Sequence, residues 1–329
     1  MLLVLALAPG TWLRSQIDET HSDTIEIASL PFEHNAQGPF RLEGLWEISK
    51  ESLSAGGYSA IAVLGQGEYL RLYSDRGWAL NLPSPDRREG PITQRRFYPG
   101  DVPLIEARDV ESAAYHPETR QFWLAFEDSH ILHRFAQGGD PEAFIKLPFA
   151  RLWSANSGIE AMLRLRDGRF LLLKESQSRG PAFLFDGDPV ETHRVQTFHV
   201  RYPEGYSPTD MAQLPDGRVL VVLRRVAFAS PVFEAMIGIA DPAEIGAEED
   251  WQITPLAQLE DLVPRENYEA IAVHVEDDGA LSIWLASDDN FSVFQRSLLA
   301  KFSWHADLED AEIAQEKGRQ AEAGAPSSS

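Results

Sequence analysis

The chain has 329 residues, enough for one large domain or two ordinary ones, and its 43 % apolar and 24 % charged content excludes wholesale disorder. The 51 Asp and Glu residues outnumber the 29 Lys and Arg residues, and the formal charge of −22 would repel nucleic acid and anionic membrane surfaces. Because the chain contains no cysteine, disulfides, thiolate zinc sites, iron–sulfur clusters and cysteine nucleophiles are excluded.

Residues 1–8 are almost all apolar, but this run is too short to span a bilayer. It is similar to the apolar part of an export signal, and Ala6-Leu7-Ala8 has the small-x-small form of a cleavage site, although no Lys or Arg precedes the run. We interpret residues 1–16 as an export signal or its remnant, which predicts an extracytoplasmic protein, periplasmic or secreted. An ordinary first strand or helix is the alternative.

Five segments along the chain share one layout, in which a short apolar stretch carries a small or acidic polar residue near its start. The segments are 58–64, 110–115, 159–165, 209–214 and 268–273, aligned on Ser59, Glu111, Glu160, Asp210 and Glu269 at spacings of 49 to 59 residues. Turn residues follow each segment, including three Asp-Gly pairs, and a second apolar stretch comes after each turn. A repeat of about 50 residues with several strands per copy predicts an all-β protein, a β-propeller. A β-sandwich, or two β-domains with chance similarity, is the alternative.

A strand around residues 42–48 lies too close to the first copy to form a blade of its own. We expect it to supply the outer strand of the last blade and so close the ring, which removes an exposed sheet edge. A sixth, degenerate blade within 20–50 or 225–265 is left open, and the stretch 227–264 is expected to be a surface insertion with a short helical turn. We expect one propeller domain over residues 24–305 and a polar, largely disordered tail over 306–329.

A second regularity places polar residues at the end of the second strand of each copy. They are Asp75, Glu127, Glu175, Arg225 and Asp288, with Arg76, Lys174, Arg224, Asp289 and Asn290 as neighbours. Because the first two strands of a blade run antiparallel, the start of the first and the end of the second lie at the same end of the propeller. The sequence therefore predicts a ring of polar side chains at one mouth of the central channel.

Clustered carboxylates repel one another, so holding them together requires a cation, a paired Arg or Lys, or raised pKa values. Oxygen-rich clusters suit Ca²⁺ (calcium) or another divalent cation, and cationic side chains can hold an anion such as phosphate. The predicted metal ligands are Glu111, Glu160, Asp210 and Glu269. The predicted catalytic residues are Asp75, Glu127, Glu175 and Asp288, and the predicted substrate-binding residues are Arg76, Lys174, Arg224 and Asn290. The alternative is that these residues cap strand ends and bridge blades.

Four segments carry a resemblance to a known family: Leu-Tyr-Ser-Asp-Arg-Gly at 72–77, Asn-Ser-Gly-Ile-Glu-Ala at 156–161, Asn-Tyr-Glu-Ala-Ile-Ala at 267–272 and Ala-Ser-Asp-Asp-Asn-Phe at 286–291. From about residue 42 to 304 the chain resembles the phytase-like family described as "esterase-like activity of phytase". The resemblance implies a β-propeller, an extracytoplasmic location, and phosphoester or ester hydrolysis with Ca²⁺. The chain departs from the family where Gly often follows the acidic anchor, with Ser112, Ala161 and Ala270, and where Arg224-Arg225 replaces an acidic pair.

These observations predict a metal-assisted phosphoester or ester hydrolase whose acidic site lies at one mouth of the propeller. The alternative is a non-enzymatic propeller that binds a small ligand or a protein at the same mouth. We expect a monomer that acts on a small-molecule substrate, with no nucleic-acid partner and no stable membrane span.

Overall fold

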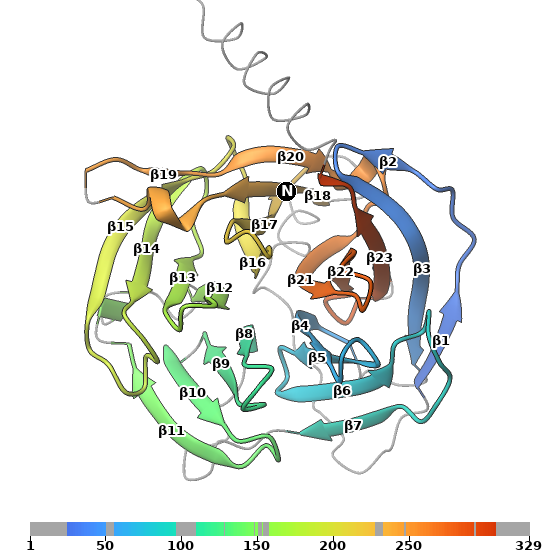
Figure 1. Cartoon of the computed structure of the whole chain (residues 1–329), viewed down its shortest axis with the longest axis horizontal. Helices are drawn as coiled ribbons and strands as arrows, with labels where there is room; N and C mark the ends of the chain where they lie inside the picture. Colours follow the sequence, from blue (N-terminus) through green and yellow to red (C-terminus); the bar gives the residue numbers. More distant parts are fainter. Residues whose placement is uncertain are drawn as a thin grey trace, which may run out of the picture.

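The structure, a computed structural model, describes residues 25–50, 56–96, 110–127, 129–147, 149–150, 153, 158–227, 233–246, 248–292 and 294–306. These residues form five sheets, antiparallel apart from one added edge strand, that surround a common centre as the blades of a β-propeller (Figure 1). The predicted export signal over 1–16 and the polar tail over 306–329 lie outside the described residues, apart from Ala306.

Each blade runs outward from an innermost strand at the centre of the ring (Figure 1). Blade 1 consists of β4 (Tyr58–Leu64), β5 (Tyr69–Ser74), β6 (Trp78–Pro83) and β7 (Thr93–Arg96). Blade 2 consists of β8 (Val110–Tyr115), β9 (Phe122–Phe126), β10 (Ile131–Phe135) and β11 (Pro141–Lys146). Blade 3 consists of β12 (Ile159–Arg164), β13 (Phe170–Lys174), β14 (Arg179–Phe185) and β15 (Val195–Arg201), with β19 (Trp251–Gln252) added at its edge.

The last two blades complete the ring. Blade 4 consists of β16 (Ser207–Gln213), β17 (Val219–Val226), β18 (Phe233–Ala240) and β20 (Thr254–Gln258). Blade 5 consists of β21 (Asn267–Val275), β22 (Leu281–Asp288) and β23 (Leu298–Trp304), followed by β3 (Phe40–Lys50), with which β1 (Ile25–Ser29) and the short β2 (Ala36–Gln37) both pair. Two 3₁₀ helices, η2 (Pro242–Glu244) and η3 (Leu259–Asp261), flank β19 and β20.

The N-terminal strand closes the ring, as the sequence predicts. β3 pairs antiparallel with β23, so that a strand from the start of the chain completes the blade formed by its last three strands. The indole rings of Trp46 on β3 and Trp284 on β22 lie 5.7 Å apart and fix this junction through apolar contact. Closure of this kind holds the first and last blades of the ring together.

There are five blades, which settles the number that the sequence left open. Residues 25–50 supply the outer strands of blade 5, and the stretch 225–265 supplies the third and fourth strands of blade 4. The expectation of a surface insertion over 227–264 is therefore wrong, because β18 is buried along most of its length. The short helical turn is present as η2, and beyond it β19 pairs in parallel with β15 of blade 3.

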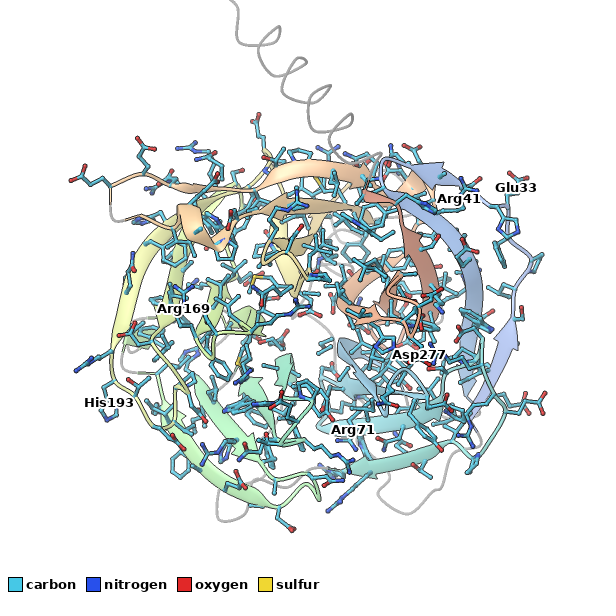
Figure 2. All side chains as sticks on the ribbon, in the orientation of Figure 1. Glu33, Arg41, Arg71, Arg169, His193 and Asp277 are labelled. Atoms are coloured by element: carbon cyan, nitrogen blue, oxygen red, sulfur yellow. The ribbon has the colours of Figure 1, made fainter. Side chains whose placement is uncertain are left out.

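Apolar side chains between neighbouring blades form the core. Charged residues such as Glu33 and Arg41 lie at the outer edge (Figure 2). All five residues of β9 are buried, because both faces of an inner strand contact another blade. Trp123 of blade 2 packs edge-on against Phe170 of blade 3 at 4.9 Å. Each such side chain contributes about 1.5–3 kcal/mol by burial, which keeps the blades in fixed positions around the mouth.

Candidate functional site

A β-bulge near the start of the innermost strand occurs in all five blades. In each blade the pairing with the second strand skips one residue, and the skipped residues are Ser59, Glu111, Glu160, Thr209 and Glu269. A bulge leaves one residue out of the ladder and redirects its side chain. Four of the five anchors aligned from the sequence are therefore bulge residues at the mouth.

In blade 4 the predicted anchor, Asp210, is wrong by one residue. The bulge residue is Thr209, and Asp210 is the ladder residue opposite Val222. The Asp210 side chain is 2 % exposed, and its carboxylate accepts a hydrogen bond from the Ile271 backbone N–H of blade 5 at 2.8 Å. Burial raises the pKa of Asp210 well above its usual range, although the backbone N–H groups of Ile271 and Met211 oppose this shift. Asp210 thus joins two blades.

The difference of one residue also applies at the end of β17, the second strand of blade 4. Arg224, opposite Ser207, is equivalent to Asp288, which is opposite Asn267, so Arg224 rather than Arg225 belongs to the second polar ring. Arg225 instead donates from Nε to Glu234 Oε2 at 2.6 Å. The corrected second ring consists of Asp75, Glu127, Glu175, Arg224 and Asp288.

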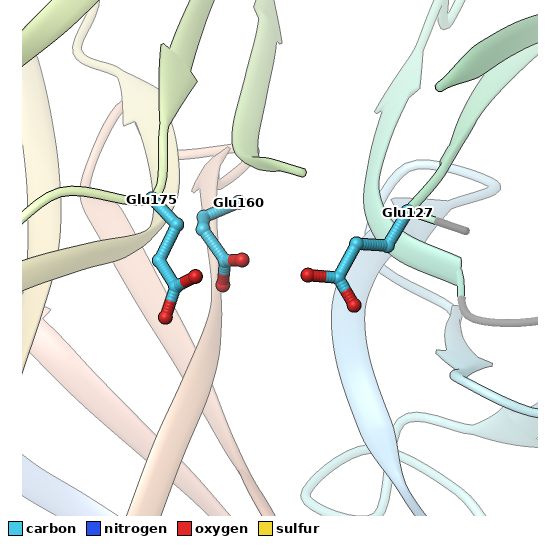
Figure 3. A group of neighbouring side chains, drawn as sticks. All are labelled: Glu127, Glu160 and Glu175. Carbon is cyan, nitrogen blue, oxygen red and sulfur yellow. The ribbon is translucent and has the colours of Figure 1, made fainter. Parts of the chain in front are cut away.

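Three acids of these two rings come together between blades 2 and 3. Glu127 follows β9, Glu160 is the bulge residue of β12, and Glu175 follows β13. One carboxylate oxygen from each lies within 4.8 Å of the others. Figure 3 shows Glu160 and Glu175 side by side on blade 3, with Glu127 facing them from blade 2. We call these three residues the glutamate triad.

Glycine at position 158 lets the two blades approach at the triad. A Cβ atom on Gly158 would lie 2.7 Å from Cγ and 3.1 Å from Cβ of Glu127, so any larger residue would push Glu127 away from blade 3. The carbonyl of Gly158 also accepts the backbone N–H of Glu175 at 3.2 Å. Gly158 was not predicted from the sequence. The signal was present, because Gly57 and Gly158 both precede a bulge residue by two positions.

The carboxylates of the glutamate triad repel one another, and a bound cation would offset this repulsion. Burial raises the pKa of Glu160 well above its usual range, and the charges of Glu175, Glu127 and Glu269 add to the shift, whereas Arg224 opposes it. Carboxylate oxygens at this density are the ligands that Ca²⁺ and Mg²⁺ prefer. The triad residues therefore fit a divalent cation.

Glu269, one of the predicted metal ligands, is engaged elsewhere in the mouth. Its carboxylate forms an ion pair with Arg224 and accepts a hydrogen bond from Asn267 Nδ2 at 2.8 Å. Among the described residues, the candidate cation site consists of the triad alone and includes neither Glu269 nor Glu111. The structure thus brings Glu160 together with two residues that the sequence analysis predicted as catalytic.

A second group of acids lies where blade 5 meets blade 1. Asp288 is 5 % exposed, and burial raises its pKa well above its usual range, with further contributions from Glu269, Asp75 and Asp289. Asp289 accepts the backbone N–H of Gly57 at 3.1 Å, which ties the loop after β22 to blade 1. The predicted substrate-binding residue Asn290 lies in this loop, and its Nδ2 donates to Gln295 Oε1 at 2.8 Å.

Two basic side chains that the sequence predicts to bind substrate pack against aromatic rings. The Arg76 guanidinium lies 3.4 Å from the ring centroid of Phe291, and the Lys174 ammonium lies 5.1 Å from that of Trp153. Each follows or precedes an acid of the second ring, so both lie at the mouth end of their blades. Trp153 and Phe291 were not selected from the sequence, because their partners lie on other elements.

No helix among the described residues is long and apolar enough to cross a membrane. Comparison with curated proteins gave no match. Among solved structures, the chain is similar to glutaminyl cyclase from Myxococcus xanthus, at 12 % identity over 76 % of this chain and 91 % of that chain, with a TM-score of 0.45. It is also similar to the Cps50 (Swd1) β-propeller domain of Myceliophteria thermophila, at 13 % identity over 83 % and 99 % of the two chains, with a TM-score of 0.41.

Hydrazine synthase from Kuenenia stuttgartiensis matches at 12 % identity with a TM-score of 0.38 over 75 % of this chain, and the chain covers 63 % of that longer protein, less than two thirds. Similarities at this level carry no argument about function. The family comparison is more specific: residues 54–291 match the phytase-like family model described as "esterase-like activity of phytase". Because this match spans more than half of the sequence, and the five-bladed propeller is in place, the chain belongs to the phytase-like family.

Proposed function

We propose that the protein is a metal-assisted hydrolase of small phosphoesters or carboxylic esters, with its site at the mouth of the propeller. The observation that carries this proposal is the glutamate triad, in which three carboxylates from two blades lie within 4.8 Å of one another. Membership of a family described by an esterase-like activity supports a hydrolytic reaction.

Glu127, Glu160 and Glu175 would hold the divalent cation, with Ca²⁺ the first candidate because all three ligands are hard oxygen atoms. When bound, such an ion supplies a Lewis acid that polarises the ester group and favours ionisation of water. This proposal changes the predicted roles of Glu127 and Glu175 from catalysis to metal binding. Glu160 keeps the role predicted from the sequence.

Other residues of the mouth would bind the substrate and transfer protons. Arg76 and Lys174 carry positive charge beside the acids of blades 1 and 3 and would attract an anionic group of the substrate. The raised pKa of Asp288 suits a carboxyl that holds a proton and releases it to a leaving group. Asp75 lies close enough to affect that pKa and would tune it.

The proposal is tested by phosphate release from phytate and p-nitrophenyl phosphate, and by hydrolysis of p-nitrophenyl acetate, in Ca²⁺ and in chelator. We expect chelator-sensitive turnover that Glu160→Gln abolishes. Glu118 lies in an exposed turn between β8 and β9, at the opposite end of the blade, so Glu118→Gln is the matched control. A folded protein with no turnover on any of these substrates would contradict the hydrolase and favour a ligand-binding propeller.

An extracytoplasmic location forms part of this proposal and is supported by the apolar run over residues 1–8. Fractionation of cells that express the full chain tests it. Recovery in the periplasm or the medium is the expected result, and recovery in the cytoplasm alone would contradict it.

A further inference from the structure

Blade 4 differs from the other blades at the mouth in the sign of one charge. The residue of the second polar ring is an acid in blades 1, 2, 3 and 5, and it is Arg224 in blade 4. The equivalence follows from strand register, because Ser207 opposes Arg224 as Asn267 opposes Asp288. A basic residue therefore occupies a position where four copies of the repeat place a carboxylate.

The charge of Arg224 is held in place by partners on blades 4 and 5. Its Nη1 donates to Glu269 and to Asn267 Oδ1, the latter at 2.7 Å. The fully buried Asn267 also donates Nδ2 to the same Glu269 oxygen, which fixes the geometry of the pair. The Phe233 ring lies 5.3 Å from the guanidinium carbon, and the Arg224 and Glu269 side chains are each 14 % exposed. Such a pair is largely removed from solvent screening.

The Arg224 charge acts across the mouth as well as on its direct partner. Glu269, Glu160, Asp288 and Glu175 all raise the pKa of Arg224, in that order, against the opposing effect of burial. The guanidinium therefore lies within electrostatic reach of two triad residues and of both blade 5 acids. Without it, Glu269 and Asp288 would lose the positive charge that offsets their mutual repulsion.

We infer that Arg224 is a built-in counter-ion that takes the place of a second divalent cation at the mouth, an inference that rests on the proposed metal centre. It neutralises Glu269 and offsets the charge of Asp288, so the mouth binds one divalent cation, at the glutamate triad. Arg224 is in this sense a positioning residue that decides which acids are available to metal. The Arg224-Arg225 pair, which departs from the family pattern, then has a physical role at its first position.

Calcium stoichiometry tests this inference by isothermal titration and equilibrium dialysis of the full chain, with wild type, Arg224→Gln and Arg224→Lys compared. We expect one Ca²⁺ per chain in wild type and in Arg224→Lys, which keeps the charge, and two in Arg224→Gln. In the double variant Arg224→Gln/Glu269→Gln we expect a return to one ion. Arg224→Gln with one ion, or wild type with two, would overturn the inference and leave the triad in place. Wild type with no bound ion would overturn the metal centre itself, so the two failures are distinct.

If Arg224→Gln does not fold without Ca²⁺, its thermal stability in Ca²⁺ still tests the inference. If Arg224 replaces a cation, saturating Ca²⁺ should restore the Tm of Arg224→Gln toward that of wild type, whereas chelator should lower it. The double variant should show no additional dependence on Ca²⁺ beyond that of wild type. Arg224→Gln that remains unfolded in saturating Ca²⁺, while the double variant folds, would contradict the counter-ion role.

Discussion

Gly158 and Glu127 are so close that a Cβ atom on the glycine would lie 2.7 Å from Cγ of the glutamate. The contact joins blade 3 to blade 2 at the glutamate triad, and it leaves no room for a side chain. Gly158, which carries no side chain itself, thus sets how closely the three carboxylates approach.

Gly158→Ala should push Glu127 away from Glu160 and weaken Ca²⁺ binding by about tenfold, which corresponds to about 1.4 kcal/mol. The change in unfolding free energy should stay within about 1 kcal/mol, because the displaced atoms belong mainly to a flexible side chain. Isothermal titration with Ca²⁺ measures the effect. Gly187→Ala is the matched control, because its Cβ would meet nothing closer than 3.9 Å. Equal affinity in both variants would show that the Gly158 contact does not position the triad.

Glu160→Gln should separate stability from metal binding. In chelator it removes the acid whose pKa is raised by burial and by Glu175 and Glu127, so the unfolding free energy should rise. In Ca²⁺ at 100 times the wild-type dissociation constant, wild type should gain about 2.7 kcal/mol and the variant almost nothing. Urea unfolding under both conditions measures the two effects. A variant that is stabilised by Ca²⁺ as strongly as wild type would exclude Glu160 as a ligand.

Asp210 should contribute to stability and leave metal binding unchanged. Asp210→Asn keeps an oxygen acceptor for the Ile271 N–H, so we expect a small effect. Asp210→Ala leaves that buried N–H without its partner and should cost about 1–3 kcal/mol. Urea unfolding and calcium titration of both variants test this. Loss of Ca²⁺ binding in folded Asp210→Asn would restore the role of metal ligand that the sequence suggested.

His133 should make the fold sensitive to acid. Its side chain is 2 % exposed, neither ring nitrogen has a hydrogen-bond partner among the described residues, and burial lowers its pKa to about 4. The unfolded chain binds the proton near pH 6.5, so stability should fall as pH drops from 6.5 toward 4, by up to about 3 kcal/mol.

His133→Leu should remove this dependence, and it should also raise stability at pH 7 because two unpaired buried nitrogens are lost. Thermal unfolding at pH 4, 5, 6 and 7 measures it. His193 is exposed at the outer edge of the propeller, so His193→Leu should keep the wild-type pH slope (Figure 2). An unchanged slope in His133→Leu would assign the acid sensitivity to other groups.

The sequence predicted the fold well because its signals are local and repeated. Apolar strands, Asp-Gly turns and a period of about 50 residues identify the propeller, and the short distance between residues 42–48 and the first copy identifies the closing strand β3. The fourth strand of blade 4, β20, was missed because a longer connection, which carries η2 and β19, separates it from β18.

The candidate site was predicted only in part because it depends on register between blades. Thr209 and Asp210 are adjacent polar residues, and the sequence does not indicate which of them the bulge leaves unpaired. The same ambiguity moved the second ring from Arg224 to Arg225. Glu127 lies beside Glu160 and Glu175, whereas Glu269 contacts Arg224. These contacts depend on how adjacent blades pack, which no spacing along the chain encodes.

An anomalous difference map from a crystal soaked in Mn²⁺, which scatters anomalously and shares the oxygen preference of Ca²⁺, locates the bound cation directly. We expect one strong peak among the carboxylate oxygens of Glu127, Glu160 and Glu175, absent from an isomorphous Glu160→Gln crystal. No peak at the triad in wild type, or a peak only at Glu269 and Asp288, would contradict it.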